Sequence, residues 1–170
     1  SIRIDIYGKA RHAAAMYPEI RLKKGKEGSV IYGHPWIFTG AIEQIGEGVV
    51  QGGLVTVVGH DGAPLGAGTY SSNSSIAVRL FDRAGVTIDT AWFARAISRA
   101  EERRRLLGFG AATETTGYRV VFSEADGVPG VIIDRYGDVV VIQISTAGAE
   151  GLRSELIAAI NTALSPTAIV

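Results

Sequence analysis

Short apolar runs separated by glycine, serine and aspartate dominate the first half of the chain. Five such runs cover residues 20–24, 41–45, 54–58, 65–70 and 76–81. Residues 27–32 are long enough for one or two helical turns before Gly33. Short strands at a spacing of about ten residues, with turn signals between them, are typical of a small barrel or sandwich. We therefore predict a compact, mostly β module over residues 17–82.

The pattern changes to helical spacing at Asp89. Apolar side chains recur at Phe93, Ile97, Ala100 and Leu107, and Gly108 supplies a C-terminal stop. This spacing predicts a helix over residues 89–107 whose other faces carry five arginines, Arg95, Arg99, Arg103, Arg104 and Arg105. Because Glu101 and Glu102 lie beside the last three, ion pairing on a solvated helix face is the favoured interpretation of that run.

The remaining residues predict a small α/β domain. Strands are expected over residues 118–122, 130–133 and 139–143, the last two joined by a turn at 134–138. A second helix, capped by Ser145 or Thr146, is expected to run to residue 163, and the apolar run 167–170 reads as a further strand. The predicted fold class is thus α+β: a β barrel-like module, then a three- to four-stranded sheet with two helices.

Two carboxylates, two glycines and a proline lie between the first two strands of that sheet. They are Glu124, Asp126, Gly127, Pro129 and Gly130, and Asp134 and Arg135 follow in the next turn. Paired carboxylates could perform acid–base chemistry or bind a hard cation. The same residues are also what a shaped turn needs, through side-chain to backbone hydrogen bonds, and this structural interpretation is favoured.

Composition excludes several kinds of site. The chain has no cysteine, so it offers no disulfide, thiolate nucleophile or cysteine-ligated metal, and no apolar run approaches the length of a membrane span. We expect a cytoplasmic protein without a metal site. Because Met16 stands where regular patterning begins, residues 1–16 are interpreted as a leader or an added segment. The run 167–170 breaks off in a strand-like pattern, which suggests a fragment of a longer protein.

The net charge of zero means that any anion site must be a local cluster. Lys23, Lys24 and Lys26 surround Gly25, which would let the backbone approach a phosphate. A solvated charged turn is the competing interpretation. His34 and Trp36 could stack on or hydrogen-bond a base, although core packing behind Pro35 is favoured for them.

Several of these segments resemble one known family. Residues 23–38, reading KKGK at the start and HPWIF at the end, together with GAGTY at 66–70 and SSIAVR at 74–79, are similar to a PUA domain. This PUA domain is found at the N-terminus of bacterial large-subunit ribosomal RNA cytosine-5 methyltransferases. YRVVFSEADGVPG at 118–130 and DRYG at 134–137 resemble the central domain of the same enzymes.

The resemblance implies a PUA-like RNA-binding domain over residues 17–84 and a central domain over residues 85–170. The family's third domain binds S-adenosylmethionine and supplies a cysteine nucleophile. The chain lacks both, so we expect that it holds no cofactor or catalytic residue, that it methylates nothing alone, and that S-adenosylmethionine serves the full-length parent.

The expected partner is structured RNA, with large-subunit ribosomal RNA as the family's substrate. The resemblance assigns the RNA contacts to Lys23, Lys24, Lys26 and Arg79, with Tyr70 as a stacking partner. It gives Glu124, Asp126, Gly127, Pro129, Gly130, Asp134 and Arg135 an architectural role in the central domain. Two alternatives stay open: a module that forms a homodimer or positions another domain without binding RNA, and a hydrolytic or metal site at Glu124, Asp126 and Asp134.

Overall fold

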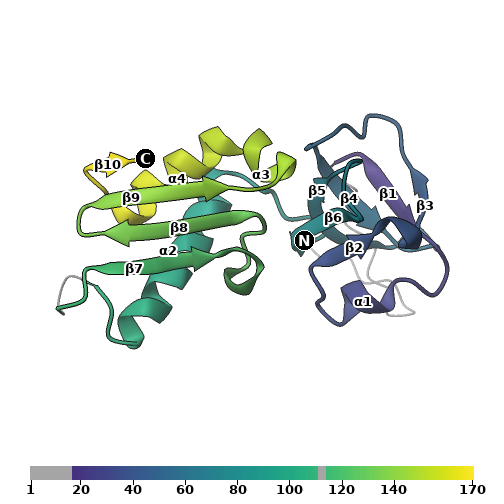
Figure 1. Ribbon diagram of the computed structural model, residues 1–170. Helices are drawn as coiled ribbons and strands as arrows, with labels where there is room; N and C mark the ends of the chain where they lie inside the picture. The colour runs from purple at the N-terminus through teal and green to yellow at the C-terminus, as the bar shows by residue number, and fades with distance from the viewer. Residues whose placement is uncertain (1–16, 111–113) are drawn as a thin grey trace, which may run out of the picture. The chain divides into compact units, whose positions relative to one another are not determined.

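The computed structural model describes residues 17–110 and 114–170 of the 170-residue chain. The segment interpreted as a leader, residues 1–16, lies outside the described residues. Within the described ranges, no helix is long and apolar enough to cross a membrane. The chain divides into two compact units, one built from residues 17–50 and 54–86 and the other from residues 51–53 and 87–170 (Figure 1). The domain limits predicted from the sequence remain a prediction.

The first unit is a curled six-stranded sheet with a short helix, which confirms the predicted barrel-like module (Figure 1). The strand order is β2-β6-β5-β4-β1-β3, and all neighbours are antiparallel except β1 and β4. Its elements are β1 (Glu19–Leu22), α1 (Gly28–Ile31), β2 (Trp36–Phe38), the 3-10 turn η1 (Thr39–Ala41), β3 (Ile42–Ile45), β4 (Leu54–Val58), β5 (Pro64–Tyr70) and β6 (Ile76–Arg83).

Alternate residues of these strands fill the interior of the curled sheet. Ile20, Leu22, Ile37, Val55, Val57 and Val78 form one fully buried cluster. Because side chains on a strand alternate between its two faces, this cluster also determines which residues face outward.

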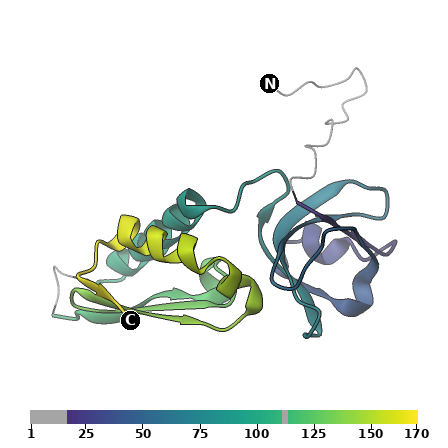
Figure 2. The ribbon, with the colours of Figure 1, turned by 90° about the horizontal axis from the view of Figure 1, so that it is seen from above.

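The second unit is a four-stranded sheet with its helices on one face (Figures 1 and 2). The strand order is β10-β9-β8-β7, and β10 is parallel to β9. Its elements are α2 (Thr90–Leu106), β7 (Gly117–Phe122), the 3-10 turn η2 (Ser123–Asp126), β8 (Val131–Tyr136), β9 (Val139–Ile144), α3 (Ala147–Gly151), α4 (Arg153–Leu164) and β10 (Ala168–Ile169). The predicted α+β class is therefore confirmed.

The first predicted helix is present with the expected ends. The Asp89 carboxylate caps it by accepting from the Trp92 backbone N–H at 2.8 Å. Gly108, at φ +87, follows the last turn in the left-handed conformation that glycine adopts readily.

The second predicted helix is broken into α3 and α4 at Leu152. Thr146 caps α3 as expected, with its hydroxyl accepting from the Ala149 N–H. Leu152 then leaves helical geometry, at φ −110 and ψ 20, while its side chain stays buried. The 3.6-residue spacing of Leu152, Leu156 and Ile160 carries no signal of this break, because each of these side chains reaches the core.

The hairpin turn between β8 and β9 is shorter than predicted. Residues 134–138 were expected to form the turn, but the strand runs through Tyr136, which pairs directly with Val139. Only Gly137 and Asp138 connect the strands, and Gly137 has the positive φ that such two-residue turns require. Asp134 and Arg135 are consequently strand residues that point to opposite faces of the sheet.

At Gly68 in the first unit, the neighbouring strand comes so close that there is no room for a side chain. A Cβ at Gly68 would collide with the carbonyl oxygen of Arg79 on β6, whereas a Cβ at Gly40 would meet nothing within 4 Å. We expect Gly68→Ala to lower the free energy of unfolding of this unit by at least about 2 kcal/mol, because backbone of β5 or β6 must move.

Trp36 fluorescence during urea unfolding, in a Trp92→Phe background, measures this loss. Gly40→Ala is the matched control and should leave the midpoint unchanged. Equal midpoints for the two alanine variants would contradict the predicted close approach of β5 and β6.

Candidate nucleic-acid interface

The lysine turn, residues Lys23–Lys26, connects β1 to α1 at the surface of the first unit. The Lys26 N–H donates to the Lys23 carbonyl at 3.0 Å, and Gly25 takes a positive φ of 79 within this tight turn. All three lysines are exposed. The Lys23 ammonium donates to the Gly40 carbonyl at 3.0 Å. The side-chain ammonium groups of Lys24 and Lys26 make no hydrogen bond or ion pair to any described residue, so their charges are available to an external anion.

A groove of about 420 Å³ lies between α1, β2 and η1, with Lys26 on its wall. Its other lining residues are Ser29, His34, Trp36, Ile37, Phe38, Gly40 and Ala41. The His34 ring stands edge-on to Trp36 at a centroid distance of 5.7 Å, and its Nδ1 accepts from the Trp36 backbone N–H at 3.1 Å. The fold thus brings a free ammonium group and two aromatic rings together, a combination suited to a nucleotide.

Arg79 shares the outer face of the sheet with Trp36. The two residues are direct cross-strand partners between β2 and β6, so their side chains project from the same face. The next pair along, Ile37 and Val78, points into the core. Arg79 is therefore next to a residue that lines the groove.

Tyr70 lies on the other face of the same sheet. Its cross-strand partner is Val78, and its side chain packs against the barrel core. The sequence interpretation grouped Tyr70 with Arg79 as one RNA-contacting edge, and the structure separates them. The reason is strand alternation: neighbouring residues on β6, here Val78 and Arg79, face opposite ways.

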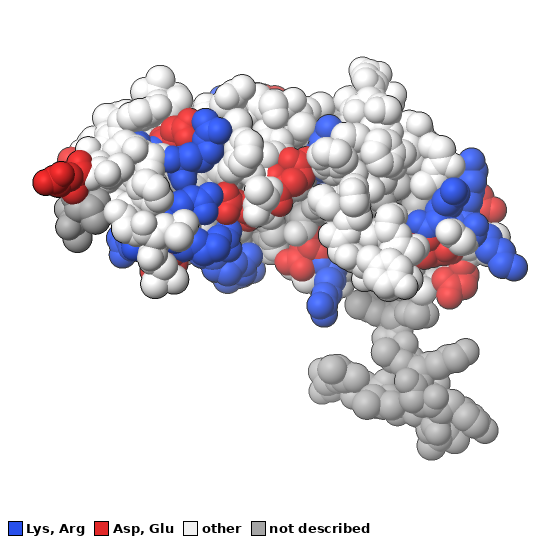
Figure 3. Space-filling view, turned by 60° about the horizontal axis from the view of Figure 1, so that its bottom comes forward, with Lys and Arg blue, Asp and Glu red and all other residues white. Residues whose placement is uncertain are grey.

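Lys24 borders a second groove, of about 470 Å³, on the other side of the lysine turn. Its lining includes the acidic side chains of Glu27 and Asp61 beside His60. Backbone hydrogen bonds, including one from the His60 N–H at 3.1 Å, lower the pKa of Glu27 and keep it charged. The two carboxylates disfavour a phosphate there, which makes the Lys26 groove the better anion site. Figure 3 shows that the basic side chains on this face are divided into separate groups, each with acidic side chains beside it.

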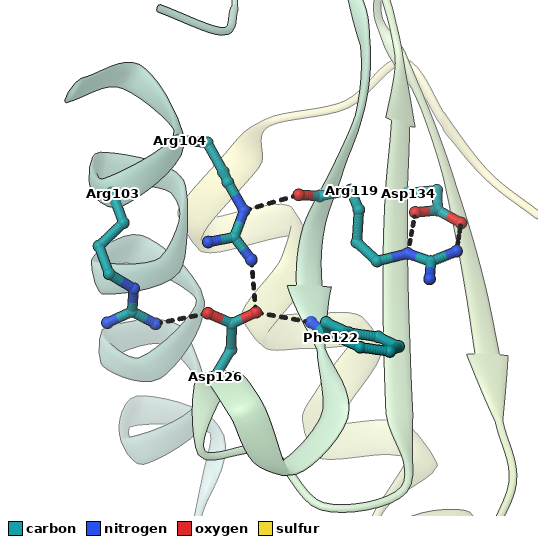
Figure 4. Close-up of polar contacts among 6 residues, drawn as sticks. All are labelled: Arg103, Arg104, Arg119, Phe122, Asp126 and Asp134. Carbon is teal, nitrogen blue, oxygen red and sulfur yellow. Dashed lines mark hydrogen bonds and ion pairs between the residues drawn. The ribbon is translucent and has the colours of Figure 1, made fainter. Parts of the chain in front are cut away.

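In the second unit the Asp126 carboxylate is a hub for three donors (Figure 4). Its side chain is only 4% exposed and accepts from Arg103 at 2.7 Å, from Arg104 at 2.5 Å and from the Phe122 backbone N–H at 2.7 Å. Arg104 also donates to the Arg119 carbonyl at 2.8 Å. These contacts connect α2 to β7 and η2.

The arginine run 103–105 was expected to pair within its own helix, and this is correct only for Arg105. Arg105 approaches Glu101 at 3.6 Å, one turn earlier on α2. Arg103 and Arg104 instead reach Asp126, more than twenty residues away in the sequence. The favoured interpretation is therefore wrong for these two side chains.

The three carboxylates suggested as a hydrolytic or metal site do not come together. Glu124 binds the hydroxyl of Ser123. Asp134, on β8 rather than in η2 with Asp126, binds the Arg119 guanidinium through two hydrogen bonds of 2.8 and 3.0 Å (Figure 4). Among the described residues, no group of three or more histidine, aspartate or glutamate side chains could hold a metal ion. The acidic pocket that this alternative requires is therefore absent from the described part of the chain.

Burial alone would raise the pKa of Asp126, but its partners reverse that effect. Hydrogen bonds from Arg103 and the Phe122 N–H, and the charge of Arg104, hold this pKa below the ordinary value for aspartate. Asp126 is thus a charged structural group at neutral pH and a poor general acid or base there.

The glycines of the motif permit the turn that positions Asp126. Gly127 ends η2 at φ +76. Gly130, also at φ +76, is packed so closely on Thr146 that a Cβ would collide with that side chain, and its N–H donates to the Ser123 hydroxyl at 2.8 Å. Pro129 between them is buried.

Arg135 turns toward the helices, where it approaches Glu101, a carboxylate that the sequence analysis placed on a solvated helix face. Glu101 is only 6% exposed, accepts from the Tyr118 hydroxyl at 2.8 Å and lies 3.8 Å from the Arg135 guanidinium. Its position within the apolar spacing of α2, next to Ala100, was the available signal that it faces the core.

Replacing Asp126 by asparagine should destabilise the second unit by about 3 kcal/mol, because two arginines lose a buried counter-ion. The carboxylate contributes fully above the pH at which the unfolded side chain titrates, and its contribution is lost as pH falls through the lowered folded-state pKa. The difference between wild type and Asp126→Asn should therefore be constant above about pH 5 and shrink in acid.

Urea unfolding followed by Trp92 fluorescence in a Trp36→Phe background measures both effects. Glu150→Gln, which removes an exposed ion pair with Arg153, is the matched control and should change little. If Asp126→Asn destabilised the unit no more than the control does, Asp126 would not be the stabilising contact described here.

Known proteins resemble this chain in sequence and in structure. Residues 20–83 match the family model described as a PUA-like domain. The ribosomal RNA large subunit methyltransferase I of Shewanella denitrificans is 44% identical over 141 residues, which is 81% of this chain and 35% of the relative. The enzyme of the same name from Salmonella schwarzengrund is 38% identical over 157 residues, which is 91% of this chain and 38% of the relative.

The fold also occurs in solved methyltransferase structures. A putative SAM-dependent methyltransferase from Streptococcus mutans superimposes with a TM-score of 0.75 at 18% identity, covering 89% of this chain and 40% of that protein. A putative methyltransferase complexed with SAH gives a TM-score of 0.76 at 19% identity, with the same coverage. The chain thus spans little more than a third of the length of the curated relatives it matches. Residues 20–83 thus match a PUA-like domain, and most of the chain is similar in sequence to a part of the ribosomal RNA large subunit methyltransferases I.

Proposed function

We propose that this chain is the RNA-recognition portion of a SAM-dependent ribosomal RNA (cytosine-5) methyltransferase. One observation carries the proposal: the Lys26 ammonium, free of any described partner, lines the same groove as His34 and Trp36. The ammonium supplies a phosphate contact, and the rings supply a surface for an unstacked base. Lys23, Lys24 and Arg79 add positive charge around this groove.

Local contacts must carry this binding, because the net charge of zero provides no long-range attraction for a polyanion. Each phosphate contact releases counterions, so the affinity should depend steeply on salt. The competing function is a module that dimerises or positions another domain. It would need no free lysines and would show no salt-dependent RNA affinity.

The methyl donor and the chemical step belong, in this proposal, to residues beyond this chain. The chain has no cysteine to attack a cytosine. Neither described sheet is a doubly wound parallel sheet with a glycine-rich turn, the arrangement that typically holds an adenosine cofactor. In this proposal the role of the described residues is to hold the RNA, and S-adenosylmethionine serves the full-length parent.

Reversing the three charges of the lysine turn should weaken binding of a ribosomal RNA hairpin more than tenfold at low salt. The variant Lys23→Glu/Lys24→Glu/Lys26→Glu should also flatten the dependence of log affinity on log salt, by up to about 0.9 for each phosphate that the protein no longer neutralises. Fluorescence anisotropy at about 50 and 200 mM salt measures both quantities.

The matched control reverses three exposed charges elsewhere, Arg95→Glu/Arg99→Glu/Arg153→Glu, and should bind as wild type does. Equal losses of affinity in both triple variants would mean that only net charge matters. Absence of RNA binding by the wild type at low salt, with self-association instead, would favour the dimerisation module.

Removing the Trp36 ring, which lines the groove, should weaken RNA binding, whereas changing Tyr70, which faces the core, should not. We expect Trp36→Ala to reduce affinity for the same hairpin by about 5- to 100-fold, the usual loss when one stacking ring is removed. Tyr70→Leu, which also removes a ring, should change affinity little, because the Tyr70 ring packs on the barrel interior. Circular dichroism verifies that both variants are folded, and equal RNA affinities for the two would argue against the groove.

A further inference from the structure

The four-stranded sheet of the second unit has one face that no helix covers. In Figures 1 and 2 all the helices of this unit lie on the opposite side of the sheet. The register of the strands determines which side chains occupy the uncovered face. Across its three longer strands they are Arg119 and Phe122 on β7, Ile132, Asp134 and Tyr136 on β8, and Val139, Val141 and Gln143 on β9; we call this set the open face.

Two aromatic rings on the open face are available to solvent. Phe122 is 51% exposed and Tyr136 is 59% exposed. The direct cross-strand partner of Tyr136 is Gly117, and a Cβ there would lie 3.4 Å from the Tyr136 ring. The ring therefore lies against glycine backbone on the β7 side, and its large exposed fraction leaves a surface on which a base could stack.

Arg119 holds the second ring and retains spare donors. Its guanidinium lies 5.2 Å from the centroid of the Phe122 ring and donates two hydrogen bonds to Asp134 (Figure 4). A guanidinium has five N–H groups, so three remain for other acceptors, such as a phosphate or a base edge. Its side chain is 45% exposed, which leaves these donors accessible.

We propose that the open face binds a single-stranded segment of RNA, with bases stacked on Tyr136 and Phe122 and polar contacts from Arg119. This would be a second RNA surface, separate from the Lys26 groove, and it rests on the proposed RNA-binding function. A charged pair lies between the rings, so the face is not the continuous apolar surface that typically marks a protein partner. Stacking is also tolerant of sequence, because every base offers a π face.

The two surfaces should respond differently to salt. Phosphate contacts at the lysine turn give an affinity that falls steeply as salt rises, whereas stacking on neutral rings depends much less on salt. Loss of a ring on the open face should therefore lower affinity while leaving the salt slope nearly unchanged. This difference in salt dependence separates the open face from the lysine turn.

An unstructured RNA of about eight nucleotides tests the inference, since single-strand sites span about 4–16 nucleotides. We expect Tyr136→Ala to weaken its binding about 5- to 100-fold with an unchanged salt slope, and Phe122→Ala to act similarly. Tyr136→Phe keeps the ring and should bind within about twofold of wild type. Trp92 emission verifies that each variant retains the fold of the second unit.

Wild-type affinity in the Tyr136→Ala/Phe122→Ala variant would overturn the open-face proposal, while a loss of affinity in the lysine variant of the same experiment would leave the proposed function standing. The reverse result, a loss only in the ring variants, would support the open face and refute the lysine turn as the RNA contact. Sedimentation in the absence of RNA completes the test. A wild-type dimer that Tyr136→Ala converts to monomer would assign the face to a second copy and overturn the RNA proposal.

Discussion

The buried carboxylate of Asp126 is the constraint on which the second unit depends. A charge that is only 4% exposed is tolerated because two guanidinium groups and a backbone N–H surround it. Those donors come from α2 and β7, so satisfying the charge fixes the helix against the sheet. The loop that carries Asp126 requires Gly127 and Gly130 at positive φ. This explains physically why the motif that carries the family resemblance has these residue types.

The same ion pairs determine where positive charge is free. Arg103, Arg104 and Arg119 are all engaged by carboxylates of the second unit. Lys24 and Lys26 have no such partner among the described residues, and the Lys26 groove adds aromatic rings to the charge. A phosphate would compete with a carboxylate for these arginines, whereas the groove that Lys26 lines has no acidic lining residue. The charge distribution therefore supports an RNA contact at the lysine turn better than at the arginine run.

Local patterns predicted most of the strands, the α+β class and the first helix, because apolar runs and glycine stops act over a few residues. The strand at residues 54–58 was predicted at its observed bounds. Contacts between residues far apart in the sequence could not be predicted from these local patterns. No local signal pairs Arg104 with Asp126, or places Trp36 opposite Arg79. The sequence likewise carries no signal that Tyr70 and Arg79 lie on opposite faces, because this depends on strand register, which a bulge between Ala67 and Gly68 alters.

The two tryptophans offer the most direct test of the central claim, because one lies in each unit. Trp36 lines the proposed RNA groove, and Trp92 is buried against Phe93 in the second unit. An NMR titration of the ¹⁵N-labelled chain with a ribosomal RNA hairpin would follow both indole N–H signals. The account predicts that the Trp36 signal shifts or broadens in proportion to bound RNA while the Trp92 signal stays in place. Saturated binding that leaves the Trp36 signal unmoved would contradict it.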